Sequence, residues 1–307
     1  KIQKKKTNKN VTGYTELFHK KKDSNLLKVN FHTHSTFCDG KNTPEENVVS
    51  AIKKGFKILG FSSHSTWPFP FGDSIKKDEF EKYIQEINSL KQKYADQIEI
   101  FCGFEADYIP PFCKPDFDAY KKFSPDFLIG SVHYLYNGEN SPEKTMPVDW
   151  SAEKLFEGIK NIYAGDTKKM ICRYFESERK MLSECNFSII GHADLVRKFN
   201  QKNPFFNENE SWYKNELKET AKSISHAGII CEINTGAISR GFLTLPYPSE
   251  YFLTLLHEQN VPIMLSSDSH AAETLDCAFE QAVALAKKIG YTELAYPKNK
   301  NIITYKI

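Results

Sequence analysis

The stretch VNFHTHSTFCDG, residues 29–40, places two histidines one residue apart where an apolar run ends, and an acid and a glycine follow. In an extended strand, residues i and i+2 point to the same face, so His32 and His34 can present two imidazole rings to one point. Imidazole is a common metal ligand, and Asp39 adds a carboxylate nearby. This stretch therefore indicates a metal site at the end of a strand.

Six further apolar runs of strand length follow, and most are separated by enough sequence for a helix. They are KILGFSSH (57–64), IEIFCGFE (98–105), FLIGSVH (127–133), FSIIGH (187–192), GIICEIN (228–234) and VPIMLSSD (261–268). This alternation predicts an α/β fold with a parallel sheet or barrel.

Helix signals fall between these runs. Thr43 is expected to cap the first helix, Pro44 to stand at its first position, Glu46 to complete a capping box and Gly55 to end it. The other expected helices span residues 78–94, 151–162, 174–185, 211–226, 249–258 and 272–289. The long interval 136–186 predicts two helices outside the regular repeat.

The composition limits the function classes. The 307 residues carry a net charge of only +2, so no global field favours nucleic acid or an anionic membrane. Seven scattered cysteines without a C-x-x-C pair suggest a reducing cytoplasm. No apolar run approaches the roughly 20 residues that span a bilayer. Residues 1–27 are expected to form a lysine-rich extension, and residues 28–307 one catalytic barrel domain.

Acids and histidines recur where the predicted strands end. A single histidine in an apolar run is more often a core residue, but six of the nine histidines share this placement. In a parallel barrel these ends meet on one face, where active sites lie. The candidate metal ligands are His32, His34, Asp39, His64, Glu105, His133, His192, Asp268 and His270.

Nine ligands exceed the six or so of one octahedral ion, so we expect two or three divalent metals that share a bridging carboxylate, Glu105 or Asp268. Imidazole together with carboxylate suits zinc, manganese or iron. Clustered metals activate water and clamp phosphoryl oxygens, which favours hydrolysis of a phosphate ester. Arg197 and Arg240, near the ends of the fifth and sixth strands, are the candidate phosphate ligands.

The ordered motifs HTHS…DG, GFSSH, GFEADY, GSVHYL, IIGHADLVRKF, CEINTGAISRG and SSDSH resemble the histidinol-phosphate phosphatases of the PHP (polymerase and histidinol phosphatase) superfamily. The similarity runs from about residue 28 to 290. It implies a distorted (β/α)7 TIM-like barrel with a trinuclear centre. The implied ligand sets are His32, His34, Glu105 and Asp268 for one metal, Glu105, His133 and His192 for a second, and Asp39, His64 and His270 for a third.

The resemblance also implies a reaction. A metal-bridging hydroxide would attack phosphorus and convert L-histidinol phosphate to L-histidinol and phosphate, a step of histidine biosynthesis. Glu105, Asp268 and His270 are the expected catalytic residues, and Arg197 and Arg240 would steady the phosphate.

Two alternatives remain open. A related phosphoesterase could share every ligand and act on another phosphomonoester, or on nucleic-acid ends and diesters. The second alternative is a barrel that stores metal or has a regulatory role and does not catalyse a reaction. The absence of a basic groove interleaved with aromatic residues argues against nucleic acid, and a small phosphate ester is the expected partner.

Overall fold

The computed structural model describes residues 26–69, 73–136 and 145–307. Its central sheet has seven strands, all parallel, in the order β1-β2-β3-β4-β7-β8-β9. The strands are β1 (Val29–Asn30), β2 (Ile58–Phe61), β3 (Glu99–Asp107), β4 (Phe127–Ser131), β7 (Ile189–Ile190), β8 (Ile230–Asn234) and β9 (Ile263–Ser266). They correspond one by one to the seven predicted runs.

The sheet closes on itself just beyond its first and last strands. Thr33 and Ser269 form a parallel bridge, in which the Ser269 carbonyl accepts from the His34 amide at 2.9 Å and the His32 carbonyl from the Ser269 amide at 3.2 Å. The predicted distorted (β/α)7 barrel is therefore confirmed. The same bridge aligns the chain after β1 with the chain after β9, where several predicted ligands stand.

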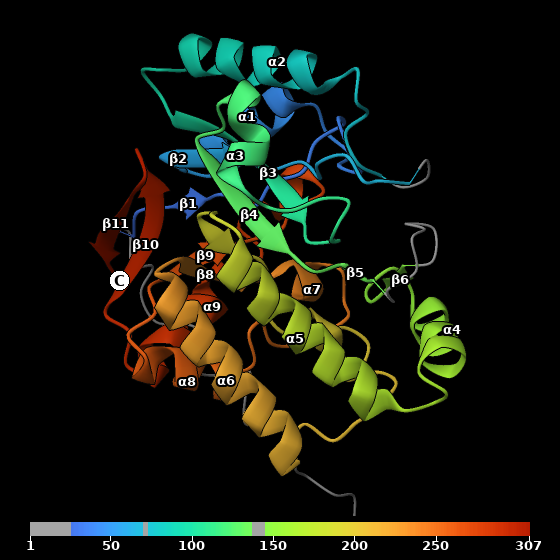
Figure 1. Ribbon diagram of the computed structural model, residues 1–307. Coiled ribbons are helices and arrows are strands. Elements are labelled where there is room, and N and C mark those ends of the chain that lie inside the picture. The colour runs from blue at the N-terminus through green and yellow to red at the C-terminus, as the bar shows by residue number, and fades with distance from the viewer. Residues whose placement is uncertain (1–25, 70–72, 137–144) are drawn as a thin grey trace, which may run out of the picture.

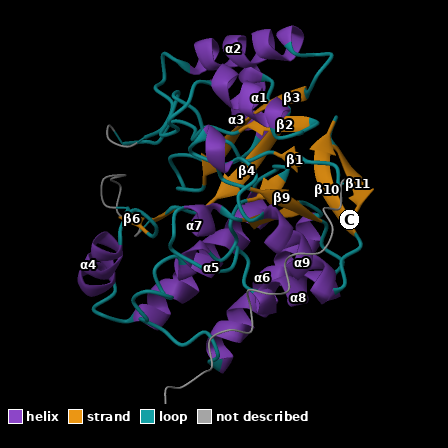
Figure 2. Cartoon of the chain, turned by 180° about the vertical axis from the view of Figure 1, so that it is seen from behind, coloured by secondary structure: helices purple, strands orange, loops and turns teal. Residues whose placement is uncertain are grey.

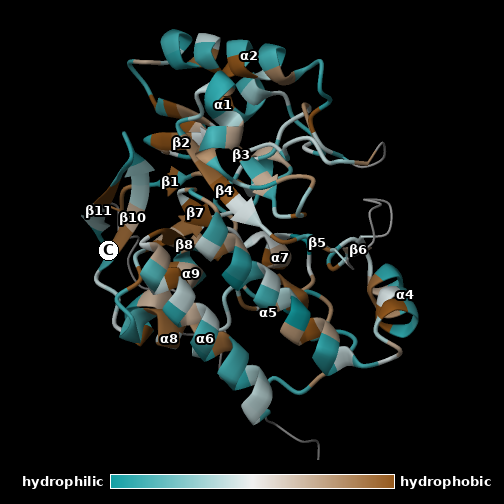
Figure 3. Ribbon diagram, in the orientation of Figure 1, coloured by the Kyte–Doolittle hydropathy of each residue, from teal (hydrophilic) through white to brown (hydrophobic). Residues whose placement is uncertain are grey.

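Helices cover the outside of the barrel. Figure 1 shows α1 and α2 on one side and α5, α6 and α8 on the opposite side. Their bounds are α1 (Pro44–Lys53), α2 (Phe80–Lys93), α3 (Phe117–Tyr120), α4 (Ala152–Ile162), α5 (Thr167–Glu184), α6 (Ser211–Ala227), α7 (Gly236–Ser239), α8 (Glu250–Glu258) and α9 (Phe279–Ile289). The strands are predominantly hydrophobic and the helices mix polar with apolar residues, as Figure 3 shows.

The helix ends test the predicted boundaries. The capping box between Thr43 and Glu46 is present and starts α1. Helix α5 begins at Thr167, not at 174, because the Asp166 side chain accepts a hydrogen bond from the Lys169 amide and caps it there. Helix α9 begins only at Phe279, not at 272, since the preceding Ala278 has a left-handed backbone with φ of 57°.

A hairpin that the sequence did not predict closes the amino-terminal end of the barrel. It consists of β10 (Glu293–Lys298) and β11 (Asn301–Lys306), which lie beside the barrel in Figures 1 and 2. Ala295 and Tyr296 join the apolar cluster of the barrel interior, which includes Phe31 and Phe127. With this end filled by apolar side chains, only the opposite end of the barrel is left for polar chemistry.

A second small ribbon, β5 (Tyr134–Leu135) and β6 (Met146–Pro147), leads into α4 and α5. These are the two helices expected outside the regular repeat. Within the described residues, no helix combines the length and the apolar character needed to cross a bilayer. The predicted boundary at residue 27 stays a prediction, because residues 1–25 of the proposed extension lie outside the described part of the chain.

Candidate metal centre

The nine predicted metal ligands all lie in the described residues, within β3 or just after β1, β2, β4, β7 and β9. Seven of the nine side chains are almost fully buried, and Asp39 and His270 are half-buried. The structure brings every one of them to the carboxyl end of the barrel. This is the convergence that the sequence predicted from the strand ends.

One group forms around the first strand. Nε2 of His32 lies 3.1 Å from Oε2 of Glu105 and 3.7 Å from Oδ1 of Asp268. Nε2 of His34 lies 3.5 Å and 3.3 Å from the same two oxygens. These four residues are the set expected for one metal.

The other two expected sets also assemble. Nε2 of His192 lies 3.0 Å from Oε1 of Glu105 and 3.2 Å from Nε2 of His133. In the remaining set, Oδ2 of Asp39 lies 2.9 Å from Nε2 of His270 and 3.9 Å from Nε2 of His64.

Glu105 is at the centre of the cluster. Its Oε1 faces His133 and His192, and its Oε2 faces His32, His34 and His64. One carboxylate thus contacts imidazoles of all three sets. This position suits a bridging ligand, which is the role expected for Glu105.

The cluster contains buried polar atoms that form no hydrogen bond with any described residue. They include Nε2 of His32, Nε2 of His34, Oδ1 of Asp39, Nδ1 of His64 and Oε2 of Glu105. Buried polar atoms are rarely left unpaired, and here the unpaired atoms converge, some within 3.1 Å of one another without hydrogen-bond geometry. Divalent metal ions bound between these atoms would serve as partners for all of them. The residues present therefore fit the expected metal centre.

The electrostatics of the cluster also favour cations. Burial opposes the charged form of His133, but the nearby Asp107 and Glu105 carboxylates outweigh burial and raise its pKa to about 10. Burial lowers the pKa of His64 to about 4, against the pull of Glu105. Despite burial, Arg240 and neighbouring histidines hold the pKa of Asp268 well below its ordinary value. Carboxylates that stay ionised in a buried site attract positive charge.

Two carboxylates that the sequence reasoning missed orient the histidines. Nδ1 of His32 lies 2.9 Å from Glu232, and Nδ1 of His133 lies 2.9 Å from Asp107. Such partners fix the ring of a metal-binding histidine and leave its other nitrogen free for the ion. The available signal was an acid inside an apolar strand run, Glu232 in GIICEIN, and an acid two residues after Glu105.

The backbone is strained at two of the candidate ligands. His192 has a φ of 21° and Asp268 a φ of 47°, both in the left-handed region that side-chain-bearing residues seldom adopt. Strain of this kind, of order 1–3 kcal/mol per residue, persists where the surrounding structure holds a functional geometry.

A cavity of ≈ 240 Å³ opens beside the cluster. Two cationic side chains line it, Arg240 and Lys198. Arg240 donates to the backbone oxygen and to Oδ2 of Asp268, at 3.0 and 2.9 Å. Lys198, which the sequence reasoning passed over in favour of its neighbour, is nearly buried.

Arg197 points elsewhere. Its Nε donates to Oε2 of Glu208 at 2.7 Å, and Asp194 lies 3.4 Å from its Nη1. It is not among the residues that line the cavity. A role for Arg197 in phosphate binding stays a prediction, whereas Arg240 is placed beside the cluster as expected.

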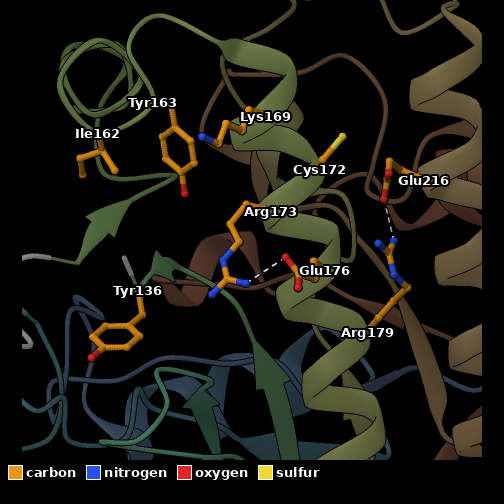
Figure 4. A pocket seen from close by; sticks show the side chains of 9 residues that line it. All are labelled: Tyr136, Ile162, Tyr163, Lys169, Cys172, Arg173, Glu176, Arg179 and Glu216. Carbon is orange, nitrogen blue, oxygen red and sulfur yellow. Dashed lines mark hydrogen bonds and ion pairs between the residues drawn. The ribbon is translucent and has the colours of Figure 1, made fainter. Parts of the chain in front are cut away.

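A larger cavity of ≈ 580 Å³ lies away from the cluster, along α5 (Figure 4). Arg173 and Arg179 line it, but each is paired, with Glu176 and Glu216 respectively, both at 2.9 Å or less. None of the nine candidate ligands lines this cavity. The catalytic candidate is therefore the smaller cavity beside the histidines.

A parallel barrel with imidazoles and carboxylates gathered at the carboxyl ends of its strands defines a metal-dependent hydrolase type of site. The model of the PHP domain family matches residues 30–236, which is more than half of the chain. The chain belongs to the PHP domain family, as the ordered motifs predicted.

Two curated relatives match over most of their length. A Schizosaccharomyces pombe protein named "Probable histidinol-phosphatase" is 28% identical over 285 residues, 87% of this chain and 89% of the relative. The histidinol-phosphatase of Bacillus subtilis is 26% identical over 274 residues, 83% of this chain and 98% of the relative.

Among solved structures, a histidinol phosphate phosphatase from Lactococcus lactis, complexed with zinc, L-histidinol and phosphate, is similar to this chain with a TM-score of 0.66. The match covers 90% of this chain and 98% of the other, at 23% identity. This likeness supports the barrel fold.

Proposed function

We propose that the chain is a metal-dependent phosphomonoesterase that hydrolyses L-histidinol phosphate to L-histidinol and inorganic phosphate. The observation that carries the proposal is the convergence of nine imidazole and carboxylate side chains beside a cavity lined by two cations. The substrate is drawn from the curated relatives, which are named for this activity.

The nine side chains would hold two or three divalent ions, with zinc, manganese and iron as the chemically suited metals. The sets proposed are the three described above, with Glu105 shared between the first and the second. When bound, such ions lower the pKa of a coordinated water toward neutrality and offset the negative charge of a phosphoryl group.

The rest of the reaction depends on residues that line the cavity. Arg240 is proposed to bind the phosphoryl oxygens, since a guanidinium matches phosphate in a bidentate manner. Lys198, from the loop after the neighbouring strand β7, would add a point charge. Glu105, Asp268 and His270 line the same cavity and remain the residues proposed to act in catalysis.

A nucleic-acid substrate is less well supported. Besides the two cations, the cavity wall carries the carboxylates of Asp39, Asp73 and Asp149. These negative charges oppose a polyanionic strand, whose binding depends on many cationic contacts.

We also propose a reducing, cytoplasmic location, which the free thiols of all seven cysteines support.

The direct test is phosphate release from L-histidinol phosphate by protein stripped with a chelator and then reloaded with zinc, manganese or iron. Hydrolysis that depends on the added metal is expected. Efficient hydrolysis of other phosphomonoesters without hydrolysis of this one would overturn the substrate assignment. Metal-dependent cleavage of labelled DNA ends in place of phosphate release would favour the nucleic-acid alternative.

A further inference from the structure

The cavity beside the candidate metal centre is lined by two chemically different sets of residues. Arg240 and His270 belong to the proposed catalytic site. The second set consists of Trp67, Tyr134 and the segment Asp149–Trp150. An aromatic wall next to a carboxylate is suited to an organic cation with an attached ring.

The aromatic wall is packed in place. The ring centroids of Trp67 and Tyr134 are 5.3 Å apart, and Phe69 packs against both. The indole nitrogen of Trp67 donates to Asp107 at 2.6 Å, and Asp107 also contacts His133. The wall is thus fixed relative to a candidate metal ligand.

Asp149 is held beside this wall by the segment that follows the β5–β6 ribbon. The backbone amide of Val148 donates to the carbonyl of His133 at 2.9 Å, which places the next residue against the site. Nζ of Lys198 donates to the backbone oxygen of Asp149 at 2.7 Å and to its Oδ2 at 3.0 Å. The carboxylate therefore has a defined position in the cavity.

The Asp149 carboxylate is charged at neutral pH. Burial alone would raise its pKa, but Lys198 and His133 outweigh burial and lower it to about 2. One of its oxygens is bonded to Lys198. The side chain is about a quarter exposed and lines the cavity, so it is accessible to a ligand while still shielded from bulk solvent.

We propose that Asp149 determines substrate specificity by binding the ammonium group of the alcohol that leaves, while the aromatic wall of Trp67 and Tyr134 packs against its ring. The proposal rests on the proposed function, since L-histidinol carries an ammonium group on the carbon next to its phosphorylated hydroxymethyl group.

Asp73 is another carboxylate that lines the cavity and is not a candidate metal ligand, so it serves as a matched control. Its side chain is exposed, so water screens its charge, whereas Asp149 is partly shielded and held by Lys198. We therefore expect an ammonium group to bind at Asp149 in preference to Asp73.

The experiment compares two substrates, L-histidinol phosphate and imidazolylpropyl phosphate, which has the same ring and phosphate but no ammonium group. The ratio of their kcat/KM values is measured for the wild type, Asp149→Asn, Asp149→Glu and Asp73→Asn. Loss of the ion pair with Lys198, or of overall stability, lowers the kcat/KM values of both substrates alike and leaves their ratio unchanged. The ratio therefore isolates recognition of the ammonium group.

The wild type is expected to favour L-histidinol phosphate by about tenfold or more, as one charge-assisted hydrogen bond allows. Asp149→Asn should remove most of this preference, Asp149→Glu should keep part of it, and Asp73→Asn should retain it. An unchanged ratio in Asp149→Asn, an equal loss in Asp73→Asn, or a wild type without preference would overturn the inference. Failure of the wild type to hydrolyse either compound would instead overturn the proposed function.

Discussion

Nδ1 of His32 lies 2.9 Å from Oε2 of Glu232, although the two residues are 200 positions apart in the sequence. The same carboxylate accepts from the backbone amide of His192 at 2.7 Å, from the side-chain amide of Asn234 at 2.7 Å and from the hydroxyl of Ser266. Glu232, in β8, therefore connects its own strand to β9 and to the segments that follow β1 and β7, and it contacts two candidate metal ligands.

Replacing Glu232 with Gln should weaken metal binding. Every group around this carboxylate donates a hydrogen bond, so an amide nitrogen placed there faces other donors and the His32 ring loses its fixed orientation. We expect a loss of about 10- to 100-fold in metal affinity, the usual effect of removing such a partner. Competition with a calibrated chelator measures it, and equal affinities in both proteins would contradict the role assigned to Glu232.

Replacing Glu105 or His192 with Ala should abolish turnover. Glu105 contacts imidazoles of all three proposed sets, so its loss should lower kcat by more than the roughly 100-fold expected for an orienting partner. The barrel core is apolar, and we expect little change in the thermal unfolding midpoint. His226→Ala is the control, because His226 is exposed on α6 and bonds only to the Lys222 carbonyl among the described residues. Near-normal turnover of either site variant in metal-controlled buffer would rule out its assignment as a ligand.

Gly236 allows Arg240 and Asp268 to pair. A Cβ added at Gly236 would come within 2.7 Å of Asp268 Oδ2 and 2.8 Å of Arg240 Nη2. Gly236→Ala should therefore push this pair apart and lower kcat/KM by about 10- to 100-fold.

Gly165 provides the contrast to Gly236. It lies in the turn before α5 with a φ of 83° and open space around its α-carbon. Gly165→Ala should cost about 1–2 kcal/mol of stability through backbone strain and leave the kinetics unchanged. If Gly236→Ala kept full activity, the Arg240–Asp268 pair would not contribute to turnover.

Glu178 should make stability depend on pH. It is buried in α5, where Tyr174 donates to one oxygen at 2.9 Å and the other oxygen has no partner among the described residues. Burial, reinforced by Asp194, raises its pKa well above the ordinary 4.5, so the folded protein keeps a proton that the unfolded chain releases.

The stability that Glu178 contributes is complete below pH 4.5 and is lost as the pH rises through the raised pKa. In Glu178→Gln this loss should disappear. Denaturant unfolding of both proteins from pH 5 to 8 measures it, and the free energy of unfolding of the wild type should fall relative to the variant. A difference that is constant with pH would show that Glu178 does not titrate in this range.

The barrel and the convergence of the candidate ligands could be predicted because six of the seven apolar runs carry a histidine or an acid at or just beyond their ends. His133 and His192, for example, each stand two residues after the end of a buried strand, and parallel strands bring such positions together whatever the details of packing. The hairpin β10–β11 was missed because its alternating pattern is interrupted by Pro297 and follows the last expected barrel helix. Local pattern does not show which end of a barrel a terminal hairpin covers.

The cationic side of the cavity could not be predicted from the sequence. Arg197 and Lys198 are adjacent; Arg197 ends the short 3₁₀ helix Leu195–Arg197, and of the two only Lys198 lines the cavity. In the folded chain Glu208 and Asp194 bind the arginine, and the lysine turns inward. Likewise, Glu232 and Asp107 gain their roles from partners that are distant in the sequence or on another strand.

A crystal structure with Zn²⁺ and inorganic phosphate, recorded with anomalous scattering, is the decisive test of whether the nine side chains bind a cluster of metal ions. We expect two or three anomalous peaks, at least one within about 2.0–2.2 Å of a Glu105 oxygen, and a phosphate between the ions and Arg240. Histidines bonded to the carboxylates without any anomalous peak among them would contradict this expectation.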